Sequence, residues 1–133
     1  MGRILLAIVL VFSLSSPSLS QDRAIEDTIS SQIEAFQVDD FERAFNYASP
    51  FIQGVFGTHQ RFGMMVKNGY PMVWRPAELE FLNQFEDRGF TYQNIRIRDQ
   101  NGIFHALEYQ MISTPDGWRI NGVRFIEDPA LSA

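Results

Sequence analysis

The chain has 133 residues, of which 45% are hydrophobic, 14% aromatic and 20% charged. This composition is typical of one globular domain and excludes a disordered tail or a low-complexity linker. The absence of cysteine excludes a disulfide scaffold, a thiolate metal site and a cysteine nucleophile. The 11 basic and 16 acidic residues give a net charge of -5, which argues against a nucleic-acid partner, because such binders are usually basic.

The first 20 residues have the three parts of a secretory signal peptide. Arg3 supplies a positive charge, residues 4–14 form an apolar run, and small residues follow at Ser18 and Ser20. The run is too short for a membrane span, which needs about 20 apolar residues. We therefore expect cleavage after Ser20, a periplasmic or secreted mature chain of residues 21–133, and no stable membrane span after cleavage. Retention of the segment as an anchor is the alternative.

Helical periodicity begins the mature chain. Over residues 24–38, apolar side chains recur at the spacing of one helix face. Asp39 and Glu42 then have the spacing of a capping box, with Asp in the place of Ser or Thr. Ser49, which precedes a proline, is typical of a helix N-cap, and Thr58 can cap one more helix. The sequence thus predicts one long helix and two or three short ones before residue 70.

After Gly69 the apolar period changes from helical to two. Residues 72–75 lie between two prolines and predict a short edge strand. Alternation over residues 77–81 and 91–98 predicts two half-buried strands. These segments indicate the start of an antiparallel meander.

Two strong hairpin signals, at residues 99–102 and 115–117, delimit the last strands. Gly122 predicts a bulge, because the apolar register shifts there. The tail from about residue 127 is expected to fray. Between the hairpin signals, one face of a strand carries Ile103, Leu107, Tyr109 and Met111.

Helices that precede an antiparallel meander indicate an α+β domain. We expect residues 21–133 to form a single domain in which a bent sheet of four or five strands wraps around the long helix. Such a sheet often leaves a pocket between its concave face and the helices, where a ligand would bind.

Blocks of sequence from the first helix to the last strand resemble one bacterial family. The blocks are Ile33–Asp40, Ala44–Ile52, Phe62–Tyr70, Trp74–Pro76 and Gly117–Val123. The family is that of domain of unknown function 4864, which is typically found in exported proteins of proteobacteria. Its architecture is similar to the cystatin-like and nuclear-transport-factor-like cone folds. The resemblance therefore implies an exported, cone-shaped α+β domain, and it implies no site residue because the family carries no established activity.

His105 and Tyr109 are the candidates for catalysis. His105 shares the strand face of Tyr109, which we expect to face the helices, so it could act as a general base with Tyr109 assisting. The alternative is a histidine at the edge of the core, hydrogen-bonded to a neighbour. Neither His105 nor His59 has a partner at metal-ligand spacing, and we expect no metal site and no cofactor.

An aromatic segment after the last predicted helix is the candidate for ligand or partner binding. It contains Tyr70, Met72, Trp74 and Arg75, residue types that are common in binding hot spots. The alternative is that Trp74 fills one end of the core, since large aromatic side chains are mostly buried.

Charged residues alternate on the outer faces of two predicted strands. Glu78 and Glu80 lie about 7 Å apart along one strand, a separation that could suit a glycosidase pair. Arg96 and Arg98 face the same way on another strand and could bind an anion. The simpler expectation is that the two strands are neighbours and form cross-strand ion pairs.

Two functional classes follow from these candidates. The first is a non-catalytic exported module that binds a small apolar ligand in the cone or a periplasmic protein through the segment at residues 70–76. The second is a small cone-fold enzyme of isomerase, dehydratase or hydrolase type with His105 as general base. The enzyme needs a second polar group that points at His105 inside a pocket, whereas the binding module needs only an apolar pocket or patch.

Overall fold

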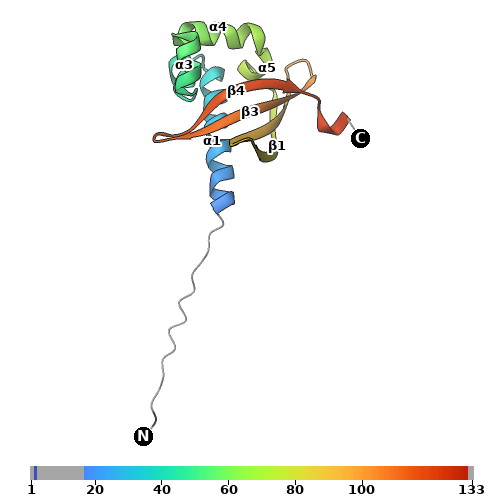
Figure 1. The fold of residues 1–133 in the computed structure, drawn as a ribbon. Coiled ribbons are helices and arrows are strands. Elements are labelled where there is room, and N and C mark those ends of the chain that lie inside the picture. The colour runs from blue at the N-terminus through green and yellow to red at the C-terminus, as the bar shows by residue number, and fades with distance from the viewer. Residues whose placement is uncertain (1, 3–16, 132–133) are drawn as a thin grey trace.

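The computed structural model describes Gly2 and residues 17–131, in which helices come first and strands follow (Figure 1). The expected signal segment lies mostly outside these residues. The predicted α+β class is confirmed. The elements are α1 Pro17–Gln37, α2 Phe41–Asn46, α3 Pro50–Phe56, α4 His59–Gly69, α5 Pro71–Trp74, β1 Glu78–Asp87, β2 Phe90–Arg98, β3 Phe104–Thr114, β4 Gly117–Ile126 and a 3-10 helix Pro129–Leu131.

Side-chain caps begin the short helices. The Ser49 hydroxyl accepts a hydrogen bond from the Ile52 N–H at the start of α3, and the Thr58 hydroxyl accepts one from the Arg61 N–H at the start of α4. Both predicted N-caps are therefore confirmed. Each cap satisfies one of the backbone N–H groups that a helix start leaves without a partner.

The predicted cap of α2 is wrong by one residue. Asp40, not Asp39, is the N-cap, and its carboxylate accepts from the Arg43 N–H. Asp39 instead has a φ of 56° and ends α1, where its N–H bonds to the Phe36 carbonyl. A left-handed residue in this position closes a helix C-terminus, a role that Asp tolerates better than most residues.

The predicted edge strand at residues 72–75 is also wrong. Pro71–Trp74 forms the single helical turn α5, in which the Tyr70 carbonyl accepts from the N–H groups of Val73 and Trp74. Proline at the first helical position has the φ that a helix needs and loses no helical hydrogen bond. The two prolines that bound this segment therefore mark a helical turn and not a strand.

The sheet is an antiparallel meander of four strands in the order β1-β2-β3-β4. Arg88 and Gly89 both have positive φ in the turn between β1 and β2, as a tight hairpin requires. Gln110 pairs with Gly122 whereas Met111 pairs with Ile120, so β4 carries one extra residue there. The bulge predicted at Gly122 is confirmed.

The helices cover one face of the sheet, with α1 against β4 and α5 against β2 (Figure 1). On that face Leu107, Tyr109 and Met111 are fully buried, as predicted, beside Ile25 and Ile29 of α1. Each aliphatic side chain buried in this way contributes about 1.5–3 kcal/mol.

Two details at the ends of the strands differ from expectation. Ile103 lies in the turn before β3 and is exposed, so it is not part of the buried face. Within the tail expected to fray, Asp128 is buried and bonds to Arg96, which attaches the chain to the sheet at that residue. Within the described residues, no helix is both long enough and apolar enough to cross a membrane.

Candidate functional site

A cavity of about 230 Å³ lies between the helices and the inner face of β3 and β4. Its deep part is formed by buried side chains, among them Gln32, Phe36, Phe62, Val66, Tyr109 and Ile120. Its rim is formed by half-buried residues of α3, α4 and β4 and the residue after α4, namely Ile52, Phe56, Met65, Tyr70, Gly122 and Val123. The cavity therefore opens where α3 and α4 pass over β4, which is an edge strand of the sheet.

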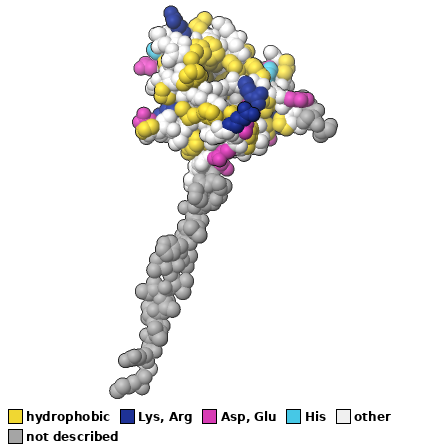
Figure 2. All heavy atoms as spheres, viewed as in Figure 1, with side chains coloured by type: hydrophobic (Ala, Val, Ile, Leu, Met, Phe, Trp, Pro, Cys, Tyr) yellow, Lys and Arg dark blue, Asp and Glu magenta, His cyan; other side chains and the backbone are white. Residues whose placement is uncertain are grey.

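Apolar side chains also surround this part of the molecule on the outside. Phe51, Val55 and Met64 belong to α3 and α4 and are more than half exposed. Figure 2 shows hydrophobic side chains gathered over the end of the molecule where Figure 1 places these helices. An apolar molecule that approaches the rim meets an apolar surface first.

The Tyr109 hydroxyl is the unusual group in the cavity wall. Tyr109 is fully buried, and its hydroxyl has no hydrogen-bond partner among the described residues. Burial raises the pKa of Tyr109 well above its usual value, and the nearby Tyr70 acts in the same direction. The side chain is therefore neutral, and its O–H is free to donate. A buried polar group without a partner costs about 1–3 kcal/mol, so it needs an explanation.

The other polar side chains in the wall already have partners. The Gln32 amide donates to the Ala44 carbonyl at 3.1 Å, and the Tyr70 hydroxyl donates to the Val123 carbonyl at 3.2 Å. Asn94 Oδ1 is the second buried oxygen without a partner in the described residues, but Asn94 does not line the cavity. Among the described residues the wall is therefore mostly apolar: the Tyr109 hydroxyl lacks a partner but has no accessible surface, and Gln32 Oε1 accepts no hydrogen bond from the protein.

His105 is bound elsewhere. Its Nε2 lies 2.8 Å from Asp99 Oδ2, at the hairpin between β2 and β3. The hydrogen bond from His105, with those from the backbone N–H groups of Ile103 and Asn101, lowers the pKa of Asp99. His105 is not among the described residues that line the cavity, so the structure does not place it in one pocket with Tyr109. This is the hydrogen-bonded histidine at the edge of the core that the sequence offered as the alternative.

Of the four residues in the aromatic segment, only Tyr70 reaches the cavity. Tyr70 stands at the rim and stacks on Phe125, with ring centroids 5.1 Å apart. Met72 is buried in the core. The segment thus contributes to the site through one residue.

Trp74 and Arg75 hold the end of α1. Trp74 Nε1 donates to Asp39 Oδ1 at 2.8 Å, and Arg75 donates both to Asp39 and to the Phe36 carbonyl. The Trp74 hydrogen bond, followed by that of Arg75, lowers the pKa of Asp39. The Arg75 guanidinium also lies over the Trp74 ring, 3.9 Å from its centroid. Both side chains therefore have structural contacts that account for their positions.

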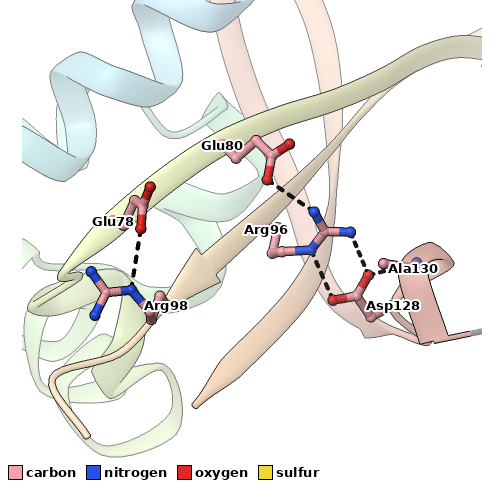
Figure 3. Close-up of polar contacts among 6 residues, drawn as sticks. All are labelled: Glu78, Glu80, Arg96, Arg98, Asp128 and Ala130. Atoms are coloured by element: carbon pink, nitrogen blue, oxygen red, sulfur yellow. Dashed lines mark hydrogen bonds and ion pairs between the residues drawn. The ribbon is translucent and has the colours of Figure 1, made fainter. Parts of the chain in front are cut away.

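The outer face of the sheet carries the ion pairs that the alternation predicted (Figure 3). Glu78 pairs with Arg98 at 3.2 Å, and Glu80 pairs with Arg96 at 2.9 Å, from directly opposed positions on β1 and β2. Figure 3 also shows the Arg96 guanidinium held between Glu80 and Asp128. These charges satisfy one another, which accounts for them without a glycosidase pair or an anion site.

Asp128 ties the end of the chain to this face. Its two carboxylate oxygens accept from Arg96 at 2.9 Å and 2.6 Å, and one of them also accepts from the Ala130 N–H. The hydrogen bonds from Arg96 and then from Ala130 lower the pKa of Asp128. The same contacts raise the pKa of Arg96, so the pair stays ionised at neutral pH.

Sequence reasoning missed most of the cavity wall. It identified Tyr109 only as an assistant to His105, and it did not single out Phe56, Phe62 or Met65 as site residues. One signal was present: on the strand face that runs from His105, Tyr109 is the polar-tipped residue between the apolar Leu107 and Met111. Whether such a hydroxyl finds a partner depends on the helices packed against it, which the strand sequence does not reveal.

Comparisons with known proteins place the chain in a family. A search of the curated proteins found no match. A family model described as "Domain of unknown function (DUF4864)" matches residues 18–133, which include every helix and strand from the first turn of α1 onward. The chain therefore belongs to the family of domain of unknown function 4864.

Proposed function

We propose that this chain is a non-catalytic binding module that holds a small, mostly apolar ligand in the cavity beneath α3 and α4. The observation that carries this proposal is the Tyr109 hydroxyl, which is buried and without a partner in an apolar wall. A ligand with one polar atom would give this hydroxyl a partner once side chains of the wall shift to admit it, because the hydroxyl has no accessible surface in the ligand-free protein. Apolar pockets with a few polar groups are the usual form of small-molecule sites.

Water alone is a poorer occupant. A buried water molecule is stable where it finds two to four polar partners. Gln32 and Tyr70 each direct one donor to a backbone carbonyl, and the Tyr109 hydroxyl has no accessible surface, so few polar atoms of the described wall are available to a water molecule. An organic molecule gains more from this wall, because it buries apolar surface as well as forming the hydrogen bond.

The arrangement of the other candidates favours binding over catalysis. Asp99 holds His105 outside the cavity, and Tyr109 is four residues further along β3, roughly 13 Å away by strand geometry. Trp74 and Arg75 are held against Asp39, which leaves fewer free groups for a protein partner at the segment of residues 70–76.

We further propose that the module works outside the cytoplasm after cleavage behind Ser20. The cut would fall in the first turns of α1, and among residues 20–37, whose side chains the structure describes, every buried one from Ile25 onward would remain in the mature chain. Cleavage is therefore compatible with an intact core. The mass of the protein from its native cell envelope would distinguish a cleaved chain of residues 21–133 from an uncut chain that is retained as an anchor.

Native mass spectrometry of the protein purified from its own compartment tests the binding proposal. The expected result is an additional mass that disappears on denaturation. Ile52→Trp places a larger side chain at the rim of the cavity and should remove that mass. Phe51→Trp is the matched control, because Phe51 is the neighbouring residue on α3, is exposed and does not line the cavity.

Two results would contradict the proposal. One is a mature protein that carries no additional mass and takes up no small molecule when apolar compounds are supplied to it. The other is a bound mass that Ile52→Trp and Phe51→Trp retain equally while both variants remain folded.

A further inference from the structure

We propose that the cavity selects a neutral aromatic molecule of about nine non-hydrogen atoms that carries one hydrogen-bond acceptor. This inference rests on the proposed function and adds to it the chemical class of the ligand. An aryl ketone or an aromatic aldehyde has the required features. Four properties of the wall lead to this class: its charge, its volume, its rings and the unpaired hydroxyl of Tyr109.

The wall excludes an ionised ligand. Among the described residues that line the cavity, none has a charged side chain. An ammonium or carboxylate group that enters such a site loses its water and gains no counter-charge, which is unfavourable. The charged groups of the sheet lie on its outer face, where Arg96 and Arg98 are paired with glutamates. The ligand is therefore neutral when bound.

The volume limits the size of the ligand. The cavity measures about 230 Å³. An apolar cavity of about 150 Å³ accommodates benzene, which has six non-hydrogen atoms. Scaling by volume gives about nine such atoms, which corresponds to one six-membered ring with a short substituent.

Aromatic side chains surround the space. Phe62 lies 5.8 Å from Phe36 and 5.7 Å from Phe56, measured between ring centroids, and the latter pair meets edge to face. Met65 adds a soft thioether at the rim. Rings in such clusters attract a further ring through offset and edge-to-face contacts beyond simple apolar burial. A flat unsaturated ring fits this wall better than a flexible alkyl chain does.

The free donor selects an acceptor on the ligand. The Tyr109 O–H is neutral and has no partner, whereas the Gln32 and Tyr70 side chains already donate to carbonyls of the protein. A carbonyl oxygen on the ligand can accept from Tyr109 in the deep part of the cavity after neighbouring side chains move aside, because the hydroxyl has no accessible surface in the ligand-free protein. The ring then extends toward Phe56 and Met65 at the rim. The wall contains few polar atoms, so a ligand with several polar groups would leave some of them unpaired.

Three probes of nearly the same shape and size separate these requirements: acetophenone, isopropylbenzene and benzoate. Acetophenone has the ring and the neutral acceptor, isopropylbenzene has the ring alone, and benzoate has the ring with a charge at neutral pH. Dissociation constants come from NMR titrations that follow the methyl groups of Met65, Val66 and Ile120, all of which line the cavity. We expect acetophenone to bind about fivefold more tightly than isopropylbenzene and at least about tenfold more tightly than benzoate.

Tyr109→Phe removes the donor and keeps the ring. The variant should weaken acetophenone binding about 2- to 12-fold, the range of one net hydrogen bond, and should leave isopropylbenzene binding unchanged or stronger. Tyr92→Phe is the matched control: its hydroxyl accepts from Gln110 Nε2 on the outer face, and Tyr92 does not line the cavity. That control should bind all three probes as the wild type does.

The possible outcomes separate this inference from the proposed function. Benzoate that binds as tightly as acetophenone, or an equal preference for acetophenone in wild type and Tyr109→Phe, would overturn the ligand class. Another outcome is that none of the three probes shifts the methyl resonances of the cavity in a protein that retains a co-purified molecule. That result would overturn the ligand class and leave the proposed binding function standing. The absence of any such shift in a protein that carries no bound molecule would overturn both the ligand class and the proposed binding function.

Discussion

Helix α4 packs in two different ways on its two sides. On one side it touches α2 so closely that a methyl group added at Gly63 would lie 2.5 Å from Cγ of Phe41. On the other side, Phe62, Met65 and Val66 border a cavity of about 230 Å³. Interiors of proteins are normally close-packed, and the α2–α4 contact meets that standard. The cavity is therefore a local feature of a well-packed helical layer, as a binding site requires.

The largest expected effect on the free energy of unfolding comes from removing an aromatic ring on the cavity side of α4. Phe62 is buried among Phe36, Phe45 and Phe56. Phe62→Ala should lower the free energy of unfolding by about 3–5 kcal/mol, because the rings around it lose their contacts and the void grows. Urea unfolding followed by circular dichroism measures this loss. A loss below about 1 kcal/mol would mean that the ring cluster does not support the wall.

The next largest effect on stability is expected on the side of α4 that packs against α2. Gly63→Ala should lower the free energy of unfolding by about 1–3 kcal/mol, because the new methyl group collides with the Phe41 ring. Gly54→Ala on α3 is the matched control, since nothing lies within 4 Å of the added methyl group. This control should stabilise the protein by about 0.5–1 kcal/mol through helix propensity. Equal effects of the two substitutions would contradict the tight α2–α4 contact.

In the deep part of the cavity, a substitution at Tyr109 is expected to change the free energy of unfolding in the opposite direction. Tyr109→Phe should raise the free energy of unfolding of the ligand-free protein by about 1 kcal/mol, because it removes a buried hydroxyl that lacks a partner. Tyr92→Phe should lower the same quantity by about 0.5–1.5 kcal/mol, because its hydroxyl accepts from Gln110. Chemical denaturation of both variants, after removal of any bound molecule, measures the difference. A loss of stability in Tyr109→Phe would show that the hydroxyl has a partner.

The smallest expected effect on stability comes from the outer face of the sheet, which is remote from both sides of α4 and serves as a reference for them. Arg96 lowers the pKa of Asp128 below its ordinary value of 3.8. The folded state therefore holds this proton less firmly than the unfolded chain does. The pair contributes stability above the ordinary value, and the contribution is lost as the pH falls through the lowered pKa.

Thermal unfolding at about pH 7 and about pH 3 tests this dependence. Asp128→Asn should lower Tm slightly at neutral pH and reduce the drop in Tm between the two pH values. Asp116→Asn changes the same charge in the exposed turn between β3 and β4, and it should leave that drop as in the wild type. An unchanged drop in Asp128→Asn would contradict the role of the pair.

Local sequence signals predicted most of the fold correctly. The caps at Ser49 and Thr58, the bulge at Gly122 and the cross-strand ion pairs each depend on a few neighbouring residues or on strand alternation. Their free energies come from contacts that the pattern itself specifies. Such features can be predicted from the sequence because no distant element is needed to form them.

One ambiguous local signal and the features that depend on distant contacts were not predicted correctly. The segment at residues 72–75 was assigned to a strand, because the two prolines suit both a strand edge and the start of a helical turn. The attachment of Asp128 depends on Arg96, which lies 32 residues away. The cavity depends on six elements, namely α1, α3, α4, α5, β3 and β4, and no single stretch of sequence encodes the space they leave.

A crystal structure of the protein with acetophenone would test most directly whether the cavity is a ligand site built around Tyr109. We expect the ligand to lie in the cavity, with its carbonyl oxygen about 2.7 Å from the Tyr109 hydroxyl and its ring beside Phe56 and Met65. A cavity that contains only water, or a ligand that leaves the Tyr109 hydroxyl without a partner, would contradict this function.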